Sequence, residues 1–157
     1  MLIGEAPGDE EDKTGHPFVG AAGRLLDEVL KEVSIPRKSI YMTNVVKHFK
    51  CEPRGKRRLH AKPNAGEIRA CRPWLDRELE IIAPEVIVCL GATAAQTILG
   101  RTFQMTKHLG EWQMSATFEK VLATYHPSAV LRSPDPSTRR EMRQILTRDS
   151  VLAFTML

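Results

Sequence analysis

Val86-Ile87-Val88-Cys89-Leu90-Gly91 is the stretch of sequence that decides the fold. Every residue before the glycine is apolar, with no polar alternation, which is typical of a strand buried on both faces of a parallel sheet. Pro84 ends the helical pattern that precedes it. A strand with two buried faces needs a covering layer on each side. The stretch therefore predicts an α/β protein.

Segments with strand and helix character alternate along the rest of the chain. We expect further strands over residues 1–3, 40–46 and 120–124, and helices over 21–33, 67–82, 92–99 and 137–154. This alternation predicts a three-layer α/β/α architecture with a central four-stranded parallel sheet. The length of 157 residues suits a single domain over 1–157. The chain begins on its first strand, so truncation at the N-terminus is part of this expectation.

Composition restricts the class of protein. The chain carries 23 basic and 19 acidic residues, a formal net charge of +4, which permits a polyanionic partner without requiring one. Residues 47–62 hold seven Lys or Arg and one acid, Glu52. The sequence has no apolar run long enough to span a membrane and no secretion signal. Its three cysteines form no CxxC, so we expect a cytoplasmic protein without a disulfide framework.

Polar and glycine-rich loops follow three of the predicted strands, over residues 4–18, 47–63 and 126–132. In parallel sheets ligands bind beyond the carboxyl ends of the strands, so we expect these loops to converge on one site. In the first loop, Glu5 and Asp9 supply carboxylates, and Phe18 could stack on a base. The helix start at Gly20 could receive a phosphate on its free amides. An ordinary polar turn and a Phe18 that only fills the core are the alternatives.

The other loops carry cations and imidazoles. We interpret Lys56-Arg57-Arg58-Leu59-His60 as a basic loop, with a solvated charge run as the alternative. Asn44 offers a donor and an acceptor that match the imide edge of uracil, although a turn or cap role is open. His126 could stabilise a departing base and Arg132 could hold a phosphate, with a buried structural histidine as the alternative.

Taken together these segments resemble the uracil-DNA glycosylase superfamily, in its iron–sulfur branch. The run at 56–60 is similar to the X-type glycosylases, which become covalently attached to uracil-containing DNA. The resemblance implies a uracil-DNA glycosylase-like fold. The segments that carry it are residues 4–12, Pro17-Phe18-Val19-Gly20, Thr43-Asn44-Val45-Val46-Lys47, Cys71-Arg72-Pro73-Trp74-Leu75 and His126-Pro127-Ser128.

The resemblance assigns roles by position. Phe18 would stack on the flipped uracil and Asn44 would pair with its polar edge. Glu5 and Asp9 would line the sugar side, His126 would stabilise the leaving uracil, and His60 would be the nucleophile. The remaining substrate contacts implied in this way are Ala6, Gly8, Lys56, Arg57, Arg58, Ser128 and Arg132.

The resemblance also implies a [4Fe–4S] cluster. Relatives bind it partly through a CxxC before the first strand, which this sequence does not contain. His48 lies where relatives carry a third ligand and Cys71 matches the fourth, so only these two are expected to contribute. Cys51 is a spare thiol that could substitute. Ala6 replaces a glutamine that is usual in X-type members.

The sequence thus predicts excision of uracil from DNA with a covalent His60–deoxyribose C1′ adduct. The partner would be uracil-containing DNA, preferably single-stranded, bound by a monomer. A turnover glycosylase that uses water and a non-catalytic nucleic-acid-binding module are the alternatives.

Overall fold

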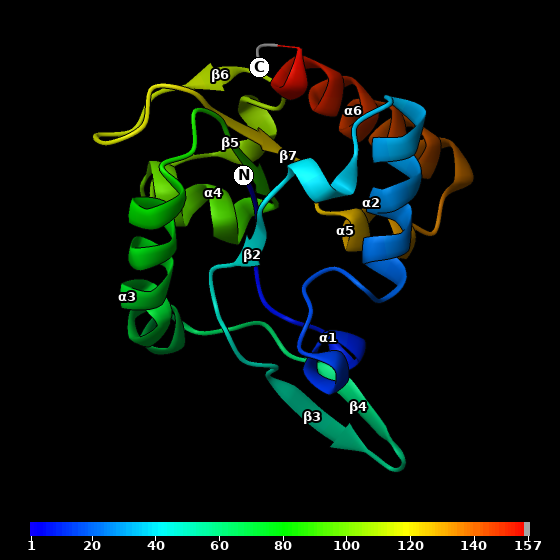
Figure 1. The fold of residues 1–157 in the computed structure, drawn as a ribbon. Helices are drawn as coiled ribbons and strands as arrows, with labels where there is room; N and C mark the ends of the chain where they lie inside the picture. The colour runs from blue at the N-terminus through cyan, green and yellow to red at the C-terminus, as the bar shows by residue number, and fades with distance from the viewer. Residues whose placement is uncertain (156–157) are drawn as a thin grey trace.

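The centre of the protein is a five-stranded sheet in the order β2-β1-β5-β7-β6 (Figure 1). The computed structural model describes residues 1–155. Strands β1 (Leu2–Gly4), β2 (Met42–Asn44), β5 (Ile87–Leu90) and β7 (Val121–Thr124) are mutually parallel, as predicted. The fifth strand, β6 (Trp112–Gln113), pairs antiparallel with β7 at one edge. Two residues are too few to show a period, so the sequence did not reveal it.

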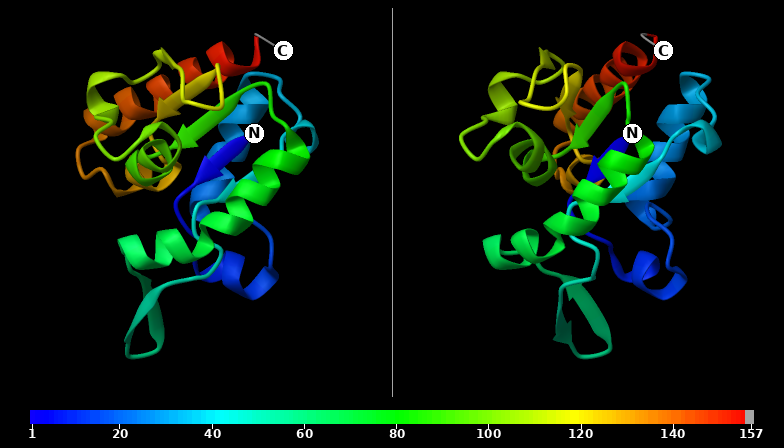
Figure 2. Two further views of the ribbon diagram at one scale, coloured as in Figure 1. Left: turned by 90° about the vertical axis from the view of Figure 1, so that its left-hand side faces the viewer. Right: turned by 60° about the vertical axis from the view of Figure 1, so that its left-hand side comes forward.

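Helices cover both faces of this sheet (Figure 2), which confirms the three-layer prediction. One face packs against α2 (Ala21–Glu32), α5 (Pro127–Arg132) and α6 (Pro136–Phe154). The other packs against α3 (Ala65–Ile82) and α4 (Ala92–Leu99). Neighbouring strand residues alternate between the two cores: Val88 belongs to the first and Cys89 to the second. Both faces are apolar, as the β5 sequence requires.

Side-chain caps set where the two long helices begin. Asn64 accepts a hydrogen bond from the Glu67 backbone N–H at 2.9 Å and starts α3 two residues before the predicted position. Asp135 caps α6 in the same way through the Thr138 N–H at 2.7 Å. Shorter helical elements lie in the connections: α1 (Asp9–Thr14), η1 (Arg37–Ser39) and η2 (Met105–Lys107).

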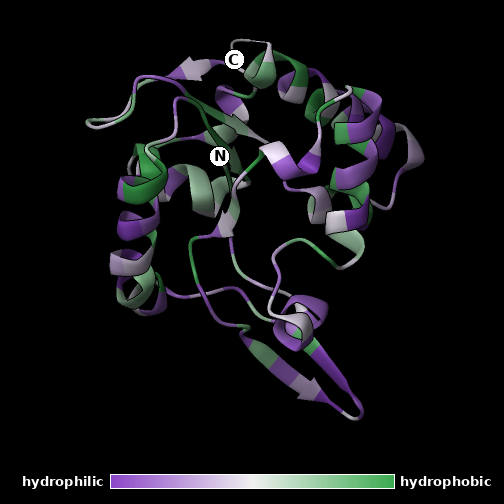
Figure 3. Cartoon of the chain, viewed as in Figure 1, coloured by the Kyte–Doolittle hydropathy of each residue, from purple (hydrophilic) through white to green (hydrophobic). Residues whose placement is uncertain are grey.

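The basic segment is not a loop, and that prediction was wrong. Strands β3 (Cys51–Arg54) and β4 (Arg57–His60) pair as an antiparallel hairpin that extends away from the sheet (Figure 1). Gly55, at φ +59°, takes the first position of a two-residue turn, where a positive φ is required. The residues of β4 are exposed, and Figure 3 shows that most of them are hydrophilic. Without a buried face, the strands carry no apolar alternation to reveal them.

Among residues 1–155, no helix has the length and apolarity needed to cross a membrane.

Candidate functional site

A cavity of about 670 Å³ lies at the carboxyl ends of the parallel strands. Segments that follow β1, β5 and β7 contribute to its wall together with Asn44, the last residue of β2, so the carboxyl ends of the four parallel strands converge as predicted. The β3–β4 hairpin adds His60 from the side. The predicted site residues that line the cavity are Glu5, Ala6, Gly8, Asp9, Phe18, Asn44, His60, His126, Ser128 and Arg132.

Phe18 and Asn44 share one wall of the cavity, and two glycines make room for them. A Cβ added to Gly4 would lie 2.5 Å from Asn44 Oδ1 and 2.6 Å from Phe18 Cζ. A Cβ added to Gly23 would lie 1.9 Å from the Phe18 carbonyl oxygen. Phe18 itself adopts φ +54° and is buried within the first core. Its ring thus fills the core and lines the cavity at once, so the two interpretations of this residue are compatible.

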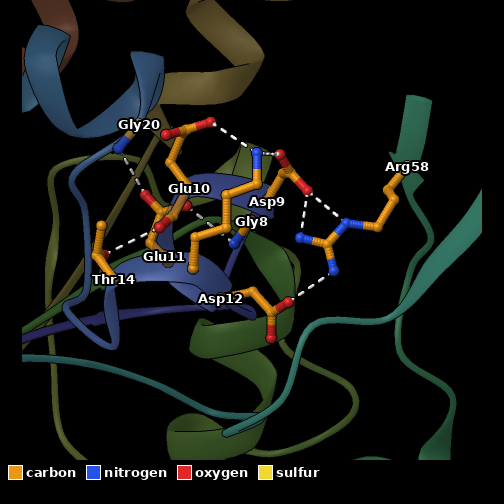
Figure 4. Close-up of polar contacts among 9 residues, drawn as sticks. Gly8, Asp9, Glu10, Glu11, Asp12, Thr14, Gly20 and Arg58 are labelled. Carbon is orange, nitrogen blue, oxygen red and sulfur yellow. Dashed lines mark hydrogen bonds and ion pairs between the residues drawn. The ribbon is translucent and has the colours of Figure 1, made fainter. Parts of the chain in front are cut away.

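Glu11 holds the first loop together, and the sequence did not single it out. Its carboxylate accepts hydrogen bonds from the backbone N–H groups of Gly8 at 3.1 Å and Gly20 at 2.8 Å (Figure 4). It also accepts one from the Val19 N–H at 2.9 Å. The Gly20 amide is therefore already bonded, which removes it as the open phosphate contact expected at this helix start. The only signal in the sequence was the acidic run around Glu11, in which no residue stands out.

Arg58 connects the hairpin to α1. Its guanidinium contacts Asp9 Oδ1 at 2.5 Å and Asp12 Oδ2 at 2.7 Å (Figure 4), and it lies over the Phe49 ring at 5.0 Å. Lys13 and Arg58 together hold the pKa of the Asp9 carboxyl below its usual range. Arg58 is thus engaged by carboxylates, unlike the open phosphate-binding cation expected.

Lys56 and Arg57 lie at the exposed tip of the hairpin, outside the cavity wall. Arg57 is paired across the turn with Arg54. Alternate residues of a strand point to opposite faces, so Arg57 faces away from the side that carries Arg58 and His60. These two cations remain open to a polyanion.

His60 faces a carboxylate inside the cavity. Its Nε2 lies 3.9 Å from Glu5 Oε1, and its ring is 6.3 Å from that of Phe49. The second Glu5 oxygen, Oε2, accepts a hydrogen bond from the hydroxyl of Thr93, in the first turn of α4. Thr93 was not singled out from the sequence. It follows β5 at the carboxyl edge of the sheet, where ligands of parallel sheets bind, so the topology rule could have found it.

His126 presents a neutral imidazole of defined tautomer. The Ser128 backbone N–H, which can only donate, lies 3.0 Å from His126 Nδ1, so that nitrogen accepts and the proton sits on Nε2. Burial, and then the nearby positive charge of Arg132, lower the pKa of His126 to about 4. The site therefore contains a neutral N–H donor, on an imidazole whose ring centroid lies 6.0 Å from that of Phe18.

A polar network supports the backbone of Asn44. The ammonium of Lys47 donates to the Asn44 carbonyl at 2.6 Å and to Thr43 Oγ1 at 2.7 Å. Glu78, on α3, accepts from both Lys47 and Thr43. These groups are at least partly buried, where an ion pair with full hydrogen bonding is well screened from water. The network fixes the end of β2.

The residues present do not make up a cluster site. His48 Nδ1 lies 3.7 Å from the Sγ of buried Cys71, so the two expected ligands are adjacent. Within residues 1–155, however, no three His, Cys, Asp or Glu side chains gather as a metal site. Cys51 lies on β3 of the hairpin, where its backbone is opposite that of His60 on β4. Two candidate ligands fall short of the four that a [4Fe–4S] cluster takes.

Comparison with known proteins agrees with this geometry. Residues 1–148 match the family model of the uracil DNA glycosylase superfamily. The chain belongs to this superfamily. It is 43% identical over 150 residues to the type-4 uracil-DNA glycosylase of Thermotoga maritima, with 95% of this chain and 72% of the relative covered. It is 41% identical over 157 residues to the type-4 uracil-DNA glycosylase of Sulfurisphaera tokodaii, with 95% and 66% covered.

A more distant superfamily member is the type-5 uracil-DNA glycosylase of Pyrobaculum aerophilum, 32% identical over 166 residues, with 94% of this chain and 69% of the relative covered. The chain therefore spans about two thirds of the length of these curated relatives. The family expected from the motifs is confirmed.

Proposed function

We propose that this protein excises uracil from DNA and then captures the sugar on His60. The observation that supports it is the shared cavity: His60 and Glu5 face each other across 3.9 Å in the space that Phe18, Asn44 and His126 also line. In this proposal Phe18 and Asn44 recognise the base, His126 donates to the leaving group and His60 is the nucleophile. The relatives' names, type-4 and type-5 uracil-DNA glycosylase, support the substrate.

Binding begins with extrusion of the target nucleotide into the cavity. Flipping costs a few kcal/mol and least in single strands, so a preference for single-stranded DNA belongs to the proposal. Phe18 offers a face to the base and Asn44 offers an amide to its polar edge. Lys56, Arg57 and Arg132 are the open cations for phosphates, and the protein acts as a monomer.

Uracil leaves with the electron pair of the C1′–N1 bond. The Nε2–H of His126 donates to the developing uracil anion, and the amide of Asn44 adds a second donor. The His126 ring is held before the reaction by the Ser128 N–H, and the backbone of Asn44 is held by Lys47. The His126 donor is therefore already oriented when the charge develops. An oxocarbenium-like C1′ remains, and the uracil anion takes a proton from water after release.

His60 then forms the new bond. One imidazole nitrogen gives its lone pair to C1′, while Glu5 accepts a hydrogen bond from the N–H of the other nitrogen and so fixes the attacking tautomer. The N–H proton of the resulting imidazolium passes to Glu5 or to solvent. The other carboxylates that line the cavity are already engaged: Asp9 by Lys13 and Arg58, Glu10 by Lys13, and Glu11 by three amides. The adduct therefore persists.

The test is incubation with a uracil-containing oligonucleotide followed by a denaturing gel and a count of released uracil. We expect a denaturant-resistant protein–DNA band, with one uracil released per protein. His60→Ala should abolish the band and retain noncovalent binding. Leu59→Ala, the neighbouring change on the opposite face of β4, is the matched control and should keep the band.

The alternatives give different results in the same assay. Excess uracil per protein without a band would select a turnover glycosylase that uses water. Binding without any uracil release would select a non-catalytic module. A band that survives in His60→Ala would exclude His60 as the nucleophile.

A further inference from the structure

We propose that Thr93 sets the partition between sugar capture by His60 and hydrolysis by water, through its hold on Glu5. Thr93 is a positioning residue in this inference, which rests on the function proposed above. The juxtaposition that carries it is a carboxylate whose two oxygens have separate tasks: Oε2 bonds to Thr93 and Oε1 faces His60.

Glu5 is fixed at both ends. Its backbone carbonyl accepts from the Val46 N–H at 2.9 Å, which ties it to the end of the parallel sheet. Its carboxylate is tied to Thr93, whose side chain is buried at 8% exposure. A carboxylate anchored at main chain and side chain keeps one orientation, so Oε1 stays directed at the imidazole. An unanchored glutamate at 24% exposure would sample several rotamers.

The position of Thr93 leaves its hydroxyl available to Glu5, because the residue four positions earlier, Cys89, lies in β5 and not in the helix. A threonine within a helix commonly donates to the carbonyl four residues earlier. Thr97, on the same helix, does so, donating to the Thr93 carbonyl at 2.7 Å. Thr93 instead donates across to the β1 loop, 88 positions away in sequence. Its place in the first turn of α4 also puts the Glu5 anion near the positive end of the helix.

This anchoring matters because Glu5 is the carboxylate that could serve either outcome. When it holds the imidazole, a ring nitrogen attacks C1′ and the protein remains attached. When it is free to rotate, it can accept a proton from a water whose oxygen bonds to C1′. The second path releases an abasic sugar and an unmodified protein. By occupying Oε2 and limiting rotation, Thr93 disfavours the water path.

The experiment measures the ratio of covalent adduct to free abasic product in single-turnover reactions with saturating uracil-containing oligonucleotide. Adduct is read on a denaturing gel, abasic product by alkaline strand cleavage, and total uracil separately. We expect Thr93→Val to lower the adduct-to-abasic ratio about tenfold, the scale of one lost hydrogen bond to a charged group. Thr93→Ser keeps the hydroxyl and should restore the ratio.

Thr97→Val is the matched control, since it removes the same hydroxyl one turn along the same helix and should leave the ratio unchanged. The ratio counts only molecules that have released uracil, so partial misfolding does not alter it. An unchanged ratio in Thr93→Val, or adduct and uracil release that fall in proportion, overturns this inference. A wild-type protein that forms no adduct overturns the proposed function instead.

Discussion

His126 is neutral because it is buried and lies near the positive charge of Arg132. Its titration should therefore be observable as a change in the free energy of unfolding with pH. Its pKa is lowered to about 4, whereas the imidazole of an unfolded chain has an ordinary value near 6.5. Between about pH 6.5 and 4, His126 is therefore protonated in the unfolded state and neutral in the folded state. Folding stability must fall as the pH drops from about 6.5 to about 4. Above that window His126 is neutral in both the folded and the unfolded state, so it makes no contribution to the pH dependence of stability.

We predict that the wild-type protein loses up to about 1.4 kcal/mol per pH unit relative to His126→Gln across this window. Urea unfolding of both proteins at several pH values measures the difference. Stability curves that run parallel from pH 7.5 to 4.5 would contradict the lowered pKa.

At the same scale, several site residues could not have been chosen from sequence alone. Glu11 stands among other acids, and only its three backbone partners distinguish it. The role of Thr93 depends on a contact 88 positions away. By contrast Asn44 and His126 directly follow or end buried strands, where the topology rule already pointed.

The hairpin is an element held by few contacts. It has no residue in either buried core, and Arg58 connects it to α1 through Asp9 and Asp12. Ion pairs exposed to solvent contribute little to the free energy of unfolding. The contacts therefore orient the hairpin more than they stabilise the protein.

We predict that Arg58→Ala slows adduct formation several-fold at saturating DNA, while the urea midpoint of unfolding changes little, because its ion pairs are exposed to solvent. The comparison is single-turnover adduct kinetics beside urea unfolding. Arg57→Ala, adjacent but on the opposite face, is the control and should keep the adduct rate at saturating DNA. Equal slowing in both variants would show that charge, and not the link to α1, is responsible.

Elements with a buried face were predictable and the hairpin was not. The β5 sequence is apolar because both of its faces are covered, and α3 and α6 carry capping residues at their starts. Strands β3 and β4 are stabilised by their own pairing and by the turn at Gly55, so their composition resembles that of a loop.

Across the whole molecule, the charge is uneven rather than large. The formal net charge is only +4, but Lys56, Arg57 and Arg132 stand open around the cavity and the hairpin tip. Each cation that binds a phosphate contributes about 0.7 to the slope of log K against log salt for single strands. DNA binding should therefore weaken with salt as these few contacts dictate.

We predict that Arg57→Ala makes this slope shallower by about 0.7, whereas Arg77→Ala on α3 leaves it unchanged. Arg77 is the matched control because it removes the same charge from a surface pair with Glu80, at 2.6 Å. Titrations of fluorescent single-stranded DNA at several salt concentrations give both slopes. Equal changes in the two variants would mean that net charge alone governs binding.

The separate location of the hairpin has a consequence for the proposed reaction. The residues proposed to recognise the base are packed against the ends of the sheet strands, where their replacement would disturb the buried cores. The proposed nucleophile, His60, instead lies on the β3–β4 hairpin, which contributes no side chain to either buried core. The proposed capture of the sugar can thus be altered by changes in one short segment, without changes to the buried cores.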